Sequence, residues 1–177
     1  LAAGAWSPRV VKELGLRLPV QPAKGYSITF DTPGEPPGQP MMLAEARIGV
    51  TPFGPQMRLA GTLELSGINL DIRGRRVDAI REALGDYLTY DDAPREEEVW
   101  VGMRPLSPDG LPMIGRPAGP SNLVVATGHS MTGMTQGPIT GLLVSQIVLG
   151  EPTALDIAPL SPQRFGAVGA AQLFAHG

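Results

Sequence analysis

The stretch Asn122–Thr135, NLVVATGHSMTGMT, contains the pattern that decides the fold of this chain. Asn122–Thr127 form a compact apolar run with β-branched residues, which is typical of a buried strand. A Gly-His pair ends this strand, and an apolar helix is predicted from Met134 or Gly137 to Leu149. The stretch therefore predicts a strand, a glycine turn and a helix in direct succession.

The turn before this helix is a candidate site for an anionic or electron-rich group. Backbone amides at a helix N-terminus have no partners within the helix and carry a partial positive charge. Glycines at such a place let a ligand approach the backbone closely. Gly133, Gly137 and Gly141 are spaced by four, so they lie near one helix face, where a strand or a second helix could pack. A plain strand–helix connection explains the same spacing, and both interpretations remain open.

The composition limits the chemistry that the chain can perform. It has 177 residues, of which 42% are hydrophobic and 18% charged, and this is enough apolar material for a core. The net charge is −3 without a basic stripe, so no nucleic-acid partner is expected. Cysteine is absent, and His129 and His176 lie far apart in the sequence, so no metal site is expected. We therefore expect any enzymatic reaction to depend on a cofactor.

The rest of the chain predicts an α+β fold. Short extended segments between residues 19 and 65 favour an antiparallel sheet, interrupted by a loop rich in proline and glycine at Asp31–Pro40. Apolar residues recur at three- and four-residue steps over Val77–Leu88, which indicates an amphipathic helix. The acidic residues Asp91, Asp92 and Glu96–Glu98 are predicted to lie in a solvated connection before a short strand at Val99–Val101, with a metal-binding role as the alternative.

Arg104 is a second candidate for a functional residue. It is flanked by apolar residues and precedes a proline, so its segment is extended and stiff. A guanidinium in apolar surroundings is costly unless it is paired, and its planar fork matches a carboxylate. The partner is either a ligand carboxylate or an internal Asp or Glu. Two other residues are open in the same way: His129 is a general base or a packed residue, and Tyr26 lines a pocket or packs on the sheet.

Two further features concern the membrane and the start of the chain. No charged residue occurs between Arg116 and Glu151, but glycines, a proline and polar residues interrupt this segment, and no apolar run reaches about 18 residues. We therefore expect no transmembrane span. The first residues, LAAGAWS (Leu1–Ser7), look like the end of a buried strand followed by a tight turn. We expect a longer protein with a missing N-terminal segment.

Six segments together carry a resemblance to a known family. They are, in chain order, LAAGAWS, PAKGYSI, LAGTLELSG, WVGMRPLSPDGLPMIG, NLVVATGHSMTGMT and PLSPQRF. This order resembles the C-terminal part of the FAD-dependent amine and amino-acid oxidoreductases of the D-amino-acid oxidase superfamily. Within that family it is most similar to the D-amino-acid dehydrogenases, with glycine oxidase and sarcosine oxidase as relatives. The resemblance covers nearly the whole chain.

The resemblance implies a division into three parts. Residues 1–18 would be the end of an FAD-binding segment, 19–104 a substrate-binding domain, and 105–177 the return to an FAD-binding, Rossmann-like domain. The dinucleotide-binding pattern GxGxxG does not occur in these residues. The N-terminal half of the FAD-binding domain would accordingly lie upstream.

The resemblance also implies roles for individual residues. Arg104 would be the catalytic residue that binds the substrate carboxylate, and Tyr26, Thr62 and Leu63 would line the substrate pocket. Gly49 stands where some oxidases carry a tyrosine, which argues against a phenol contact with the substrate. Amides in the turn before the helix would stabilise negative charge at the pyrimidine end of the flavin. The implied cofactor-binding residues are Gly4, Gly128, His129, Ser130, Met131, Thr132, Gly133, Met134 and Thr135.

The implied reaction is the oxidative deamination of a D-amino acid. Arg104 would hold the carboxylate and orient the α-hydrogen, hydride would pass to FAD, and water would hydrolyse the imino acid. The implied partners are the amino acid, a quinone or other electron acceptor, and the missing N-terminal segment. The expected location is the cytoplasm, with peripheral attachment to the inner membrane as a variant. The alternatives are an amine oxidase of the glycine, sarcosine or proline type, and a non-catalytic carboxylate-binding domain.

Overall fold

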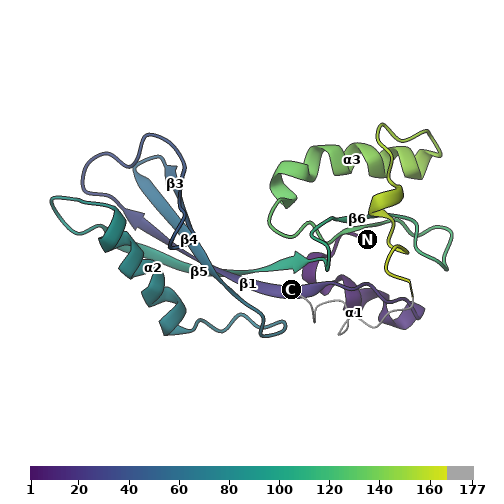
Figure 1. Cartoon of the computed structure of the whole chain (residues 1–177), viewed down its shortest axis with the longest axis horizontal. Helices are drawn as coiled ribbons and strands as arrows, with labels where there is room; N and C mark the ends of the chain where they lie inside the picture. The colour runs from purple at the N-terminus through teal and green to yellow at the C-terminus, as the bar shows by residue number, and fades with distance from the viewer. Residues whose placement is uncertain (167–177) are drawn as a thin grey trace. The chain divides into compact units, whose positions relative to one another are not determined.

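The computed structural model describes residues 1–166, which form two compact units (Figure 1). One unit comprises Lys24–Gly102, and the other comprises Leu1–Ala23 together with the chain from Met103 onward. The substrate-binding role expected for 19–104 and the FAD-binding role expected for the flanking parts stay predictions. His176 lies outside the described residues.

The unit Lys24–Gly102 is built on an antiparallel sheet. The strands of this sheet are β1 (Gln21–Asp31), β2 (Met41–Leu43), β3 (Ile48–Phe53), β4 (Gln56–Glu64) and β5 (Arg95–Leu106). The first three residues of β1, 21–23, and the last four of β5, 103–106, belong to the other unit. The strands lie in the order β2-β3-β4-β1-β5, and the pairs β2–β3, β3–β4 and β1–β4 are antiparallel. A sheet of this kind combined with helices agrees with the predicted α+β class.

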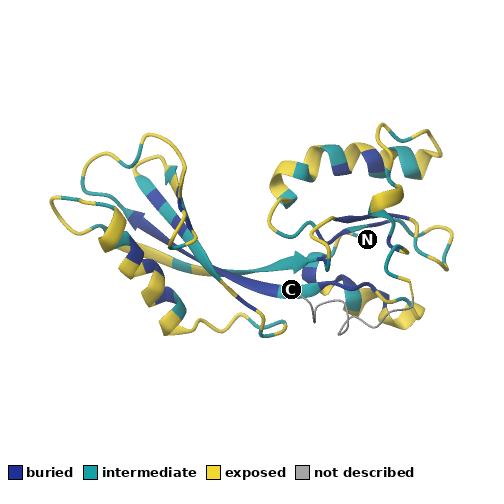
Figure 2. Cartoon of the chain, in the orientation of Figure 1, coloured by how far each residue is buried: buried dark blue, intermediate teal, exposed yellow. Residues whose placement is uncertain are grey.

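Helix α2 (Gly74–Tyr87) packs its apolar face against this sheet and closes the core of the unit. Val77, Ile80 and Ala83 are buried, which confirms the helix predicted from the three- and four-residue spacing. Figure 2 shows the buried stripe of α2 and the buried strands in dark blue. Each fully buried aliphatic side chain contributes about 1.5–3 kcal/mol. The strand residues of this core are Tyr26, Ile28, Phe30, Leu43, Ile48, Val50, Met57 and Leu59.

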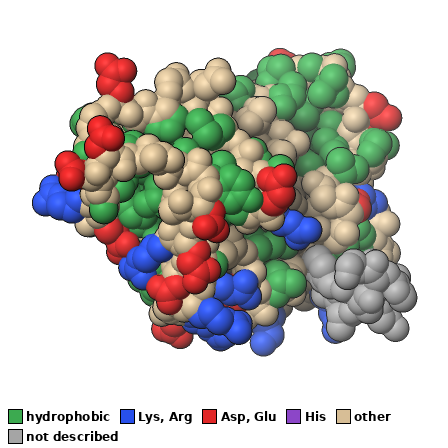
Figure 3. Space-filling view, turned by 60° about the vertical axis from the view of Figure 1, so that its left-hand side comes forward, with side chains coloured by type: hydrophobic (Ala, Val, Ile, Leu, Met, Phe, Trp, Pro, Cys, Tyr) green, Lys and Arg blue, Asp and Glu red, His purple; other side chains and the backbone are tan. Residues whose placement is uncertain are grey.

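Strand β5 corrects the expectation for the acidic run. Glu96, Glu97 and Glu98 lie in β5 and not in a connection before it. Their side chains point into solvent, where Glu96 pairs with Arg81 and Glu98 pairs with Arg58. Acidic and basic side chains stand next to one another on the face drawn in Figure 3. Because β5 is the last strand in the sheet order, it tolerates charges that a central strand would not.

A β-bulge interrupts the pairing of β1 with β4. The register shifts between Gly25 and Tyr26, so Thr62 has no partner on β1, and its φ is +51°. The neighbouring Gly61 has no room for a side chain, because a Cβ there would lie 2.5 Å from Ile48 Cγ1. A left-handed backbone is rare for a β-branched residue and costs about 1–3 kcal/mol. The surrounding sheet must therefore hold this bulge in place.

A buried ammonium group lies beside the bulge. The Lys24 side chain is 0% exposed, and its Nζ donates to Asn69 Oδ1 and to the carbonyl oxygen of Asp71, each at 2.6 Å. Glu64 lies opposite Lys24 in the register, 3.6 Å from Nζ, and accepts a 2.7 Å hydrogen bond from the Tyr26 hydroxyl. A buried charge is costly unless it is paired and hydrogen-bonded. The cluster therefore ties β1, β4 and the loop after β4 together.

This cluster predicts a specific acid sensitivity. The Ser66 and Tyr26 hydroxyls, with the charges of Arg73 and Lys24, lower the pKa of Glu64 from 4.5 to about 2. The lowered pKa stabilises the folded state above about pH 4.5, and this contribution is lost as the pH falls toward 2. Glu64→Gln should lower the free energy of unfolding at neutral pH and flatten its decline over that interval, as measured by denaturant titration. The exposed Glu45→Gln is the control, and an unchanged acid profile in Glu64→Gln would contradict the assignment.

The other unit contains the strand–turn–helix succession that the sequence predicts. Its elements are η1 (Gly4–Trp6), α1 (Ser7–Val11), η2 (Lys12–Leu14), β6 (Met113–Gly115), β7 (Val125–Thr127), α3 (Gly133–Leu149) and η3 (Ala158–Leu160). Strands β6 and β7 are antiparallel. Helix α3 begins one residue before the earlier of the two predicted starts, and Gly150 ends it with φ +73°.

The first residue of the chain runs alongside β7. The backbone nitrogen of Leu1 donates to the Val124 carbonyl at 2.6 Å, and its carbonyl accepts from the Ala126 amide at 2.8 Å. Leu1 thus bonds to the residue before Val125 and to the residue after it, which is the hydrogen-bond pattern of parallel strands. That this unit completes a Rossmann-like FAD-binding domain stays a prediction.

Two absences concern the residues that the structure describes. No helix within residues 1–166 combines the length and the apolar character needed to cross a membrane. In the same residues, no group of three or more His, Asp or Glu side chains is placed to hold a metal ion.

Candidate functional site

The end of β5 and the turn after β7 are joined by backbone hydrogen bonds. The Ser130 amide donates to the Pro105 carbonyl at 2.9 Å, and Leu106 forms an isolated antiparallel bridge with His129. The Ser107 amide also lies 3.4 Å from Ser130 Oγ. The two segments that the sequence singles out, one containing Arg104 and the other the glycine turn, are therefore neighbours in one unit.

The turn itself has an unusual backbone. Gly128 has φ +79°, and a Cβ at this position would lie 3.1 Å from Met113 Cε, so both the conformation and the space favour glycine. Ser130 also has a positive φ, +52°, which costs a non-glycine residue about 1–3 kcal/mol. The hydrogen bond to Pro105 helps to keep this conformation. The chain thereby reverses between β7 and α3 within a few residues.

A cavity of about 300 Å³ opens at this turn. It is bounded by the first residues of the chain, the end of β5, β7 with its turn, and the first two turns of α3. The predicted cofactor residues Gly4, His129, Ser130 and Gly133 all contribute to its wall. Gly137, which shares a helix face with Gly133, also lines the cavity. The remaining lining residues carry no signal in the sequence, and they are Ala2, Pro105, Ala126, Thr127 and Thr140.

The N-terminus of α3 faces this cavity through Gly133. The helix has 17 residues, and Thr132 makes no side-chain capping bond to it. No acidic residue lies in the first turn, and the first bond of the α-helical pattern runs from the Gln136 amide to the Thr132 carbonyl. The helix amides before Gln136 therefore supply a partial positive charge. Such a helix start favours an anionic or electron-rich group.

Small residues leave space on the cavity wall. A Cβ added at Gly137 or at Gly4 would meet no atom within 4 Å. Gly4 also has φ +53°, and its carbonyl accepts a 3.1 Å hydrogen bond from the Thr127 hydroxyl. Thr127 Oγ1 accepts in turn from the buried Ser7 hydroxyl at 3.0 Å. These two bonds fix the Gly4 backbone beside β7.

His129 is held by the helix that it precedes. Its Nε2 lies 2.9 Å from Thr140 Oγ1, one turn beyond Gly137 on α3. Burial lowers the pKa of His129 below its ordinary value, so the imidazole is neutral at neutral pH. A neutral ring that bonds a threonine agrees with a packed residue that also lines the cavity.

Arg104 is half-buried near the end of β5, one residue before Pro105. Within the described part of its own unit, residues 1–23 and 103–166, its guanidinium makes no ion pair and no hydrogen bond. Asp109, an acidic residue of the same unit, is already paired with Arg164. The interpretation that an internal Asp or Glu pairs with Arg104 therefore has no support within this unit.

The remaining predicted residues lie elsewhere. Met131 and Met134 are 66% and 95% exposed, and Gly128, Met131, Thr132, Met134 and Thr135 do not line the cavity. Tyr26, Thr62 and Leu63 belong to the unit Lys24–Gly102. Tyr26 is buried with its hydroxyl on Glu64, Thr62 Oγ1 is buried without a hydrogen-bond partner in that unit, and Leu63 is exposed. Their contact with substrate stays a prediction.

Known proteins are similar to this chain in both sequence and fold. A D-amino acid dehydrogenase from Allorhizobium ampelinum is 37% identical over 169 residues, which cover 94% of this chain and 40% of that protein. Glycine oxidase from Geobacillus kaustophilus superposes with a TM-score of 0.81 at 28% identity, over 94% of this chain and 44% of that one. Iminodiacetate oxidase from Chelativorans sp. BNC1 gives 0.82 at 30% identity, over 91% and 44%.

A family profile agrees with these relatives. The profile described as FAD dependent oxidoreductase matches residues 1–147, which include the cavity and both segments beside it. The chain spans less than half the length of the relatives named above. On the extent of this match, the chain belongs to the family of FAD-dependent oxidoreductases.

Proposed function

We propose that this chain is the part of an FAD-dependent oxidoreductase that binds the substrate carboxylate and one end of the flavin, and that the substrate is a D-amino acid. The observation that supports this most directly is the hydrogen bond from Ser130 to Pro105. It places the strand that contains Arg104 beside the cavity and the start of α3. The relative named D-amino acid dehydrogenase supports the choice of substrate.

The cavity fits part of a flavin cofactor. Five of its ten lining residues are glycine or alanine, and Gly4 and Gly137 leave open space there. The amides at the start of α3 favour an electron-rich ring edge. When bound, FAD supplies the two-electron chemistry that the side chains of this protein lack. The segments that hold the rest of FAD would lie outside this chain, which spans 40% of the dehydrogenase relative.

Arg104 would recognise the carboxylate of the amino acid. Its guanidinium can form two parallel hydrogen bonds to a carboxylate, which fixes the orientation as well as the position of the substrate. Orientation of the α-hydrogen toward the cavity would then lower the barrier without a covalent step by the protein. A substrate with a neutral amine needs no side-chain base, which agrees with a neutral His129 engaged with Thr140.

An amine oxidase of the glycine, sarcosine or proline type is the second candidate. Two structural relatives are named glycine oxidase and iminodiacetate oxidase, and both of the compounds in these names carry a carboxylate and an amine. Production of hydrogen peroxide would favour such an oxidase, and reduction of a quinone or dye would favour a dehydrogenase. A non-catalytic carboxylate-binding domain would show no flavin spectrum. A cytoplasmic or peripheral membrane location remains part of the proposal for the dehydrogenase.

The role of Arg104 can be tested by Arg104→Lys in the intact FAD-loaded protein that contains this chain. Lysine keeps the charge but loses the two-bond fork, so kcat/KM for the amino acid should fall about 10- to 100-fold, or about 1.5–3 kcal/mol. The FAD content, measured by flavin absorbance, should not change. Arg9→Lys on the exposed face of α1 is the matched control. Turnover close to that of the wild type would refute the assignment.

The cofactor cavity can be tested by Gly137→Leu. Gly137 lines the cavity and a Cβ there would meet no atom within 4 Å, so a leucine side chain has room to begin there and would occupy cavity space. Replacing glycine within a helix also favours the helix by about 0.8 kcal/mol. FAD should therefore be retained about tenfold less tightly, or about 1.4 kcal/mol, while the fold remains stable. Equilibrium dialysis and thermal unfolding measure the two effects. Gly141→Leu, with equal open space but outside the cavity wall, is the control, and equal FAD retention in both variants would exclude this cavity.

A further inference from the structure

We propose that Arg164 is a positioning residue for the site described above, acting through Asp109 on the turn Ser107–Gly110. This inference rests on the proposed function, because it concerns the same site. Arg164 lies far from Arg104 in the sequence and outside the cavity wall. Its contacts nevertheless lead to the backbone that joins Arg104 to the glycine turn.

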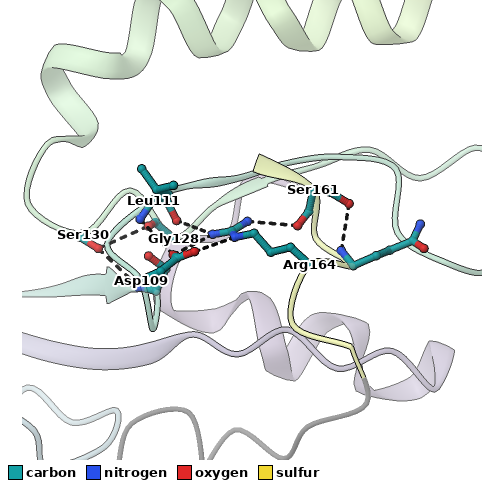
Figure 4. Close-up of polar contacts among 8 residues, drawn as sticks. Asp109, Leu111, Gly128, Ser130, Ser161 and Arg164 are labelled. Carbon is teal, nitrogen blue, oxygen red and sulfur yellow. Dashed lines mark hydrogen bonds and ion pairs between the residues drawn. The ribbon is translucent and has the colours of Figure 1, made fainter. Parts of the chain in front are cut away.

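Arg164 binds Asp109 through a two-bond ion pair (Figure 4). Its Nε donates to Oδ2 at 2.8 Å and its Nη2 donates to Oδ1 at 2.9 Å. Nη2 also donates to the Leu111 carbonyl at 2.8 Å, and Nη1 donates to the Ser161 carbonyl at 3.1 Å. The guanidinium lies 4.3 Å from the ring centre of Phe165. With its side chain only 13% exposed, Arg164 is fixed from several directions.

Asp109 passes this constraint to the turn in which it lies. Its Oδ1 accepts a 3.1 Å hydrogen bond from the Leu111 amide, so both the side chain and the backbone of the turn are held. Gly110 follows with φ +78°, and its amide donates to the Ser107 carbonyl at 3.4 Å. The Arg164 guanidinium lowers the pKa of Asp109. The Asp109 carboxylate therefore stays ionised at neutral pH.

The opposite side of the same turn contacts the candidate site. Ser107 is buried, and its amide lies 3.4 Å from Ser130 Oγ. A Cβ at Gly128 would lie 3.4 Å from Ser107 Cβ, so the two turns are in van der Waals contact. Arg104 lies in β5, three residues before Ser107, which directly follows the end of that strand. The contacts thus run without a gap from Arg164 through Asp109 and Ser107 to Ser130.

This geometry implies an effect on rate beyond an effect on stability. A carboxylate-binding arginine must place its substrate closely, and a displacement of about 1 Å can lower a rate about 100-fold. Arg116 offers a comparison within the same unit. It also donates to backbone carbonyls, those of Ser121 and Ile147, but it makes no contact with the turn Ser107–Gly110. Loss of Arg164 should therefore affect catalysis where loss of Arg116 does not.

The test compares Arg164→Lys, Arg164→Ala and Arg116→Ala in the intact FAD-loaded protein that contains this chain. We expect kcat to fall about 10- to 100-fold in both Arg164 variants, with a smaller change in KM and unchanged FAD content, and to stay near wild type in Arg116→Ala. Asp109→Asn should reproduce the loss, and Arg164→Ala/Asp109→Asn should lose no more than either single variant, because the two residues act as a unit. Unchanged kcat in a folded Arg164→Lys would overturn the proposal.

A second measurement separates this inference from the proposed function. Amide hydrogen exchange of the peptide that contains Ser130 should accelerate in Arg164→Ala and not in Arg116→Ala, whether or not an amino acid is oxidised. If the wild type oxidises no amino acid, the proposed function fails, and exchange alone decides whether Arg164 fixes the turn. Equal exchange near Ser130 in both variants would overturn the inference even in an active enzyme.

Discussion

The hydrogen bond from the Ser130 amide to the Pro105 carbonyl is the interaction on which the candidate site depends. It forms because the chain after β7 turns with positive φ at Gly128 and Ser130, which brings the turn against the end of β5. The Thr132 amide then bonds back to the His129 carbonyl, and α3 begins at the next residue. The left-handed residues Gly128 and Ser130 therefore determine where α3 begins and bring the turn before it against the end of β5.

The elements that the sequence predicts well are those whose signal is local. Helix α2 follows from the spacing of its buried residues, and the β7–α3 succession follows from an apolar run, a glycine and a second apolar run. The length of β5 could not be predicted, because Glu96 and Glu98 find their arginines 15 and 40 residues away. The bulge at Thr62 depends on the register between two strands, which no single segment of sequence contains.

The candidate site likewise contains residues that the sequence indicates and residues that it does not. A glycine turn before a helix indicated a candidate site at the segment that contains His129, Ser130 and Gly133, and these three residues line a cavity. Lining residues such as Ala2 and Pro105 contribute backbone and small surfaces, so no chemical signature distinguishes them in the sequence. The resemblance to a known family placed Tyr26 at a substrate pocket, which stays a prediction, and the structure adds that its hydroxyl bonds Glu64, 38 residues away. Side chains that act through distant partners become visible only when the fold is known.

The contacts of Lys24 have a consequence for how the loop after β4 can change in evolution. The ammonium group binds Asp71 through a main-chain carbonyl, which every amino acid supplies, so drift at position 71 leaves that contact intact. It binds Asn69 through the side-chain oxygen, while the side-chain nitrogen of Asn69 donates to the Ser66 carbonyl. Few side chains offer an acceptor and a donor at one tip. Position 69 is therefore constrained by chemistry, whereas position 71 is constrained only by the path of the chain.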